Sequence, residues 1–95
     1  MRLVEPTDFE ILAALSDGCR NNAVNLAHTL EKNRSYINTR LPILADFGLV
    51  ERVGPAANSG LYIIAERGLR ALECREQYGD PDIDFAALLD STPEE

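Results

Sequence analysis

The most constraining feature of this sequence is residues 22–50, in which two short segments with helical periodicity flank a polar break. Asn22 can cap the first segment, because its side-chain oxygen can accept from the free amides of a first helical turn. The apolar positions of that segment recur at helical spacing: Ala23, Val24, Ala27 and Leu30. The break is residues 31–33, of which Asn33 can cap the second segment. We therefore predict two short helices joined by a tight turn.

The second predicted helix spans about residues 34–47 and has two different faces. Ile37, Leu41 and Leu44 fall at i, i+4 and i+7, so they share one face and are expected to be buried. Short polar side chains lie on the other face and its flanks, which can therefore approach base edges in a major groove. This is the helix-turn-helix pattern, with 34–47 as the recognition helix. Pro42 either kinks this helix or is tolerated as a local defect in it.

A β-hairpin is predicted directly after this helix. Gly48 can take a positive φ and end the helix, residues 49–53 read as a strand, and Leu61–Ile64 as the return strand. The turn of residues 54–60 is rich in glycine, proline and small polar residues.

Two further helices are predicted outside this motif. Thr7 and Glu10 have the spacing of a capping box for a first helix that ends near residues 16–18. Residues 66–75 are predicted to form another helix, which Gly68 weakens by about 1 kcal/mol relative to alanine. A short segment, residues 82–90, starts after a cap at Asp80 and is too apolar for a disordered tail. It docks either on its own domain or on a second subunit.

The run R-L-x-x-L-x-x-x-G-L-V, from Arg40 to Val50, and the later GLYIIAERG carry a family resemblance. They resemble the winged helix-turn-helix proteins of halophilic archaea related to the phage phi-H repressor, over about residues 5–75. The resemblance implies a mainly α fold with a small β-hairpin (α+β), a three-helix core, a wing and C-terminal helices. It also implies a transcriptional regulator that binds double-stranded DNA sequence-specifically as a homodimer. We thus expect a DNA-binding domain at residues 1–75 and an acidic extension at 76–95.

The net charge of −7 lies in that extension. Residues 1–75 hold nine acidic and nine basic side chains, whereas 76–95 hold seven acidic and none basic. Residues 20–52 carry five basic and three acidic side chains, so the candidate DNA-binding segment is locally positive. The resemblance to proteins of halophilic archaea implies a cytoplasm with near-molar salt, in which the Debye length is about 3 Å. Binding would then depend on close hydrogen bonds more than on long-range attraction.

The candidate DNA contacts come from the recognition helix and the hairpin: Arg34, Ser35, Tyr36, Asn38, Thr39, Arg40, Arg52, Asn58 and Ser59. Arg40 is placed for a phosphate or for an intramolecular ion pair, and Tyr36 for stacking, for a phosphate or for the core. The wing tip contacts either the DNA backbone or minor groove, or only solvent. The alternative function is a winged-helix protein-interaction module that does not bind DNA.

Other classes of function find little support in the sequence. Cys19 and Cys74 are isolated, which predicts reduced thiols and no metal site. No glycine-rich phosphate loop or nucleophile motif is present, so no catalytic residue, cofactor or small-molecule substrate is expected. The absence of a long apolar run or signal segment predicts a cytoplasmic protein that does not contact a membrane.

Overall fold

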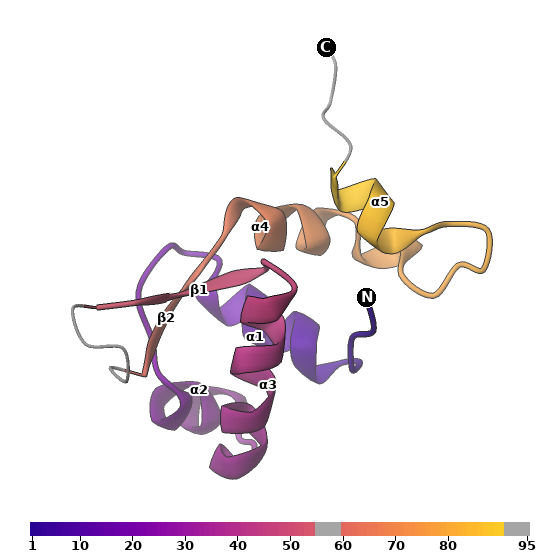
Figure 1. Cartoon of the computed structure of the whole chain (residues 1–95). Helices are drawn as coiled ribbons and strands as arrows, with labels where there is room; N and C mark the ends of the chain where they lie inside the picture. Colours follow the sequence, from indigo (N-terminus) through magenta and orange to yellow (C-terminus); the bar gives the residue numbers. More distant parts are fainter. Residues whose placement is uncertain (55–59, 91–95) are drawn as a thin grey trace.

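The computed structural model describes residues 1–54 and 60–90 (Figure 1). The elements are, in order, α1 (Thr7–Leu15), α2 (Ala23–Leu30), α3 (Arg34–Asp46), β1 (Val50–Val53), β2 (Leu61–Ile64), α4 (Glu66–Glu73), the 3₁₀ turn η1 (Arg75–Gln77) and α5 (Phe85–Asp90). In Figure 1, α4 and α5 lie at the end of the molecule opposite α2, and the hairpin extends to one side.

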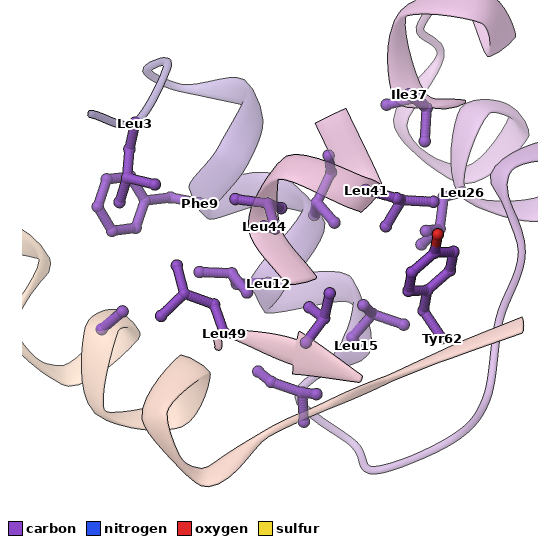
Figure 2. Close-up of a cluster of buried hydrophobic side chains, with 14 of the residues drawn as sticks. Leu3, Phe9, Leu12, Leu15, Leu26, Ile37, Leu41, Leu44, Leu49 and Tyr62 are labelled. Carbon is purple, nitrogen blue, oxygen red and sulfur yellow. The ribbon is translucent and has the colours of Figure 1, made fainter. Parts of the chain in front are cut away.

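The first three helices, the hairpin and the two C-terminal helices share one continuous core (Figure 2). Helix α1 contributes Phe9, Ile11, Leu12 and Leu15, all fully buried. The side chains that meet them from the other elements include Leu26, Ile37, Leu41, Leu44, Leu49, Val50, Tyr62, Phe85 and Leu89. A three-helix core with a two-stranded hairpin is thus the arrangement expected from the sequence.

The start of α1 differs from the prediction. Pro6 occupies the N-cap position and makes no capping hydrogen bond, whereas Thr7 is already helical and is buried. Thr7 therefore cannot act as the N-cap that a capping box requires. Asp8, which follows Thr7, makes a hydrogen bond to the segment before the helix. Its carboxylate accepts from the backbone N–H of Val4 at 2.7 Å.

Both predicted asparagine caps of the helix-turn-helix are confirmed. The side-chain oxygen of Asn22 accepts from the N–H of Asn25 at 2.9 Å. The side-chain oxygen of Asn33 accepts from the N–H groups of Ser35 and Tyr36, at 2.8 and 3.2 Å. Between the two helices, Glu31 adopts a left-handed conformation with φ 56° and ψ 47°, which reverses the chain within a few residues.

Replacing Asn33 by alanine is expected to lower the free energy of unfolding by about 1 kcal/mol, because two amides of α3 lose their acceptor. Asn33→Asp keeps an acceptor at that position and is the matched control. Urea denaturation of the three proteins measures the difference. Equal midpoints for wild type and Asn33→Ala would show that water replaces the cap without loss.

The hairpin is antiparallel, with Val50 opposite Ile64 and Val53 opposite Leu61. Strand β1 begins at Val50, one residue later than predicted, because the N–H of Leu49 still donates to the carbonyl of Leu44 at the end of α3. Residues 55–59 lie outside the described residues, so the predicted wing contacts Asn58 and Ser59 do too.

The C-terminal segment packs on its own domain, which is one of the two arrangements that the sequence allowed. Phe85 and Leu89 are buried, and the ring of Phe85 lies 5.1 Å from that of Tyr78 and 6.4 Å from that of Phe9. Helix α5 begins at Phe85 and not at residue 82. The carboxylate of Asp84, instead of Asp80, accepts from a first-turn amide, that of Ala87.

Candidate nucleic-acid interface

Helix α3 has the two faces that its sequence predicts. Ile37, Leu41 and Leu44 are 0%, 1% and 0% exposed. Four polar residues in its first two turns are exposed: Arg34, Ser35, Asn38 and Thr39. The helix continues through Pro42 to Asp46. Its first half therefore offers a row of short polar side chains and one arginine to a ligand.

Tyr36 lies on the flank of this face and is 38% exposed, so it is not a core residue. The N–H of Tyr36 is held by the cap at Asn33, which fixes the backbone from which the ring projects. The hydroxyl of Thr39 donates to the carbonyl of Ser35 at 3.0 Å. The hydroxyl hydrogen of Thr39 is thus used within α3, so this side chain can offer a ligand only an acceptor.

A shallow depression of about 190 Å³ lies beside Arg34 and Asn38. Its other walls are residues 22–24 at the start of α2 and Gly60 at the start of the return strand. Three segments that are far apart in the sequence therefore meet around these two predicted contact residues. The sequence indicated Arg34 by its place at the start of the helix and Asn38 by helical periodicity, but a depression formed by three segments had no sequence signal.

Arg40 forms the intramolecular ion pair that was one of its two predicted roles. Its Nε and Nη2 donate to the two carboxylate oxygens of Asp8 at 2.9 and 2.7 Å. The Asp8 side chain is fully buried and that of Arg40 is 12% exposed. Hydrogen bonding to Asp8 raises the pKa of the Arg40 guanidinium above its ordinary value, despite the opposing effect of burial. The pair anchors α3 to α1, and Arg40 offers little surface to DNA.

The remaining cations of the helix-turn-helix and hairpin have different partners. Lys32 pairs with Glu10 at 3.1 Å, which ties the turn of the helix-turn-helix to α1. Arg52 is exposed and donates to the hydroxyl of Tyr62, a partner without charge. Within the described part of the chain, Arg34 forms no ion pair. Arg34 and Arg52 thus retain their full charge, whereas Lys32 and Arg40 are neutralised.

The acidic C-terminal segment, as far as residue 90, lies away from this interface (Figure 1). Figure 1 shows α5 beside α4, at the end of the molecule opposite α2 and the first turns of α3. There, Asp90 pairs with Arg67, and the carbonyl of Leu89 accepts from Nη1 of Arg70 at 2.9 Å. Asp90, the acidic residue of α5, therefore does not cover the polar face of α3.

Among residues 1–54 and 60–90, no group of three or more histidine, cysteine or acidic side chains could hold a metal ion. None of the helices in those ranges is long and apolar enough to cross a membrane.

Neither a protein-family model nor a curated protein matches the chain. The structure is similar to the Cyprinid Herpesvirus3 ORF112-Zalpha domain, in a structure concerned with its binding mode to Z-DNA. The TM-score is 0.58 and the identity 23%, over 67% of this chain and 100% of that chain. This likeness is one of fold. Together with the element order, it places the chain among α+β winged-helix structures, with α3 as the second helix of the helix-turn-helix.

Proposed function

We propose that this chain binds double-stranded DNA through α3 and regulates transcription, with two copies reading half-sites about one helical turn apart. The observation that carries the proposal is the polar face of α3. It is exposed, it includes Arg34, which forms no ion pair within residues 1–54 and 60–90, and α5 with its Asp90 lies elsewhere (Figure 1). The step from DNA binding to regulation rests on the resemblance of Arg40–Val50 to proteins related to the phi-H repressor.

Asn38 and Ser35 are the proposed contacts to base edges. An asparagine amide can donate to N7 and accept from N6–H of adenine, and serine can donate or accept. Arg34, at the start of α3, either pairs with guanine or contacts a phosphate. Because few cations are available, the salt dependence of binding should be shallow, with a logarithmic slope near −2 for each copy that uses Arg34 and Arg52.

The test is selection of bound sequences from a pool of random duplexes at near-molar KCl, followed by fluorescence anisotropy with the selected duplex. Asn38→Ala is expected to weaken binding to that duplex at least fivefold and to relax the preference at one position. Arg34→Ala is expected to flatten the salt slope by about 0.9 if it contacts a phosphate. Arg2→Ala removes an exposed cation near the N-terminus and is the matched control.

A left-handed d(CG) duplex belongs in the same titration, because the similar Zalpha domain is described with Z-DNA. Preference for that duplex over every right-handed one would replace the base-reading role of Asn38 by recognition of duplex shape. Binding to no duplex would contradict the proposal and favour a protein-interaction module. Equal losses for Arg34→Ala and Arg2→Ala would also contradict it, since charge alone would then explain binding.

A further inference from the structure

Arg52 is fixed by a neutral partner, unlike its neighbours in the interface. Its Nε and Nη2 lie 3.2 and 2.9 Å from the hydroxyl oxygen of Tyr62, to which both donate. The central guanidinium carbon lies 5.5 Å from the centre of the tyrosine ring. Lys32 and Arg40 contact carboxylates instead. A hydroxyl orients a guanidinium without cancelling its charge, so Arg52 is both held in place and still cationic.

The register of the hairpin brings these two side chains together. Arg52 lies directly opposite Tyr62 across β1 and β2. The backbone N–H and carbonyl of Tyr62 are both used by Asn21, at 2.8 and 2.9 Å, on the other edge of β2. Arg52 and Tyr62 therefore form a non-hydrogen-bonded antiparallel pair, the kind in which facing side chains lie closest.

Tyr62 is itself held firmly. It is 5% exposed and belongs to the core cluster, and Figure 2 shows it at the end of the core that Leu26 and Ile37 occupy. Its ring is thus fixed by the buried residues of α2 and α3, and its backbone by Asn21. A hydroxyl on so rigid a side chain restricts the rotamers of the arginine that donates to it.

We propose that Tyr62 is a positioning residue, which orients Arg52 to contact a phosphate of the bound duplex; this inference rests on the proposed function. Two of the five N–H hydrogens of Arg52 go to Tyr62, and the other three can serve a phosphate oxygen. Immobilising a long side chain costs free energy when a ligand binds. Tyr62 already orients Arg52 before the duplex binds, so this cost is smaller. Because Lys32 and Arg40 are already paired with carboxylates, the affinity for DNA depends more strongly on how well Arg52 is oriented.

Four proteins test this: wild type, Arg52→Ala, Tyr62→Phe and the double variant, titrated with the selected duplex over a range of KCl. Arg52→Ala is expected to flatten the logarithmic salt slope by about 0.9. Tyr62→Phe, which keeps the ring and removes only the hydroxyl, is expected to weaken binding about three- to tenfold. In the Tyr62→Phe background, Arg52→Ala should have a smaller effect on affinity than in wild type.

Arg52→Lys distinguishes orientation from charge, because lysine keeps the salt slope but lacks the fork that donates twice to Tyr62. It should recover the slope and only part of the affinity. The inference is overturned if Arg52→Ala weakens binding equally in both backgrounds, or if it leaves the slope unchanged while Arg34→Ala flattens it. In either case the DNA-binding proposal survives. Failure of wild type to bind any duplex would instead remove the proposed function itself.

Discussion

Replacing Arg40 by alanine is expected to lower the free energy of unfolding by about 3–5 kcal/mol, because it leaves the fully buried carboxylate of Asp8 without its cation. The carboxylate would keep one hydrogen bond, from the N–H of Val4. Chemical denaturation followed by circular dichroism measures the loss. Because the pair is buried, the loss should persist at near-molar KCl, where exposed ion pairs are screened.

The double variant Asp8→Leu, Arg40→Met removes both charges and is the control for this prediction. An apolar pair of similar size often equals or exceeds the stability of a buried ion pair. We expect it to recover most of the loss, with a deficit of about 1 kcal/mol from the N–H of Val4, which would have no acceptor. A double variant as unstable as Arg40→Ala would show that Arg40 stabilises the fold through contacts other than its charge.

The same double variant separates folding from DNA recognition. If Arg40 serves only to anchor α3 to α1, the folded double variant should bind the selected duplex as wild type does. If the double variant lost as much affinity for the duplex as Arg34→Ala, Arg40 would have to contact DNA after all. The ion pair of Arg40 would then have to open or be shared in the complex, since its Nε and Nη2 are both engaged.

Local patterns predicted most of the fold. Ile37, Leu41 and Leu44 turn inward because helical geometry alone puts i, i+4 and i+7 on one face. The caps at Asn22 and Asn33 were equally local, since each serves amides two or three residues ahead. The capping box at Thr7 failed, because Pro6 occupies the N-cap position and Thr7 belongs to the helix.

Contacts between distant residues account for what the sequence could not predict. The partner of Arg40 lies 32 positions away, and helical periodicity contains no information about such a residue. Similarly, the apolar character of α5 predicted that it docks, but only the rings of Phe9 and Tyr78 show where. The role of Tyr62 depends on strand register, which was not predicted, so its contact with Arg52 was missed.

Gly68→Ala is expected to destabilise the protein by about 1–3 kcal/mol, although helix propensity alone predicts a gain of about 1 kcal/mol. A Cβ at Gly68 would lie 2.2 Å from the carbonyl oxygen of Leu49 and 2.8 Å from Cγ1 of Ile64. That carbonyl already accepts from the N–H of Ala65, so it cannot easily move aside. Helix α4 would have to shift away from the hairpin to admit the methyl group.

Glu73→Ala is the matched control, because Glu73 is exposed on the same helix and the change should stay within about 0.5 kcal/mol. A higher denaturation midpoint for Gly68→Ala than for wild type would contradict the close approach of α4 to Leu49. The affinity of folded Gly68→Ala for DNA tests whether a shift of α4 also changes the DNA-binding interface. Leu49 joins α3 to β1, so a shift of α4 should move the hairpin relative to α3. That shift should weaken the contact of Arg52 before that of Arg34.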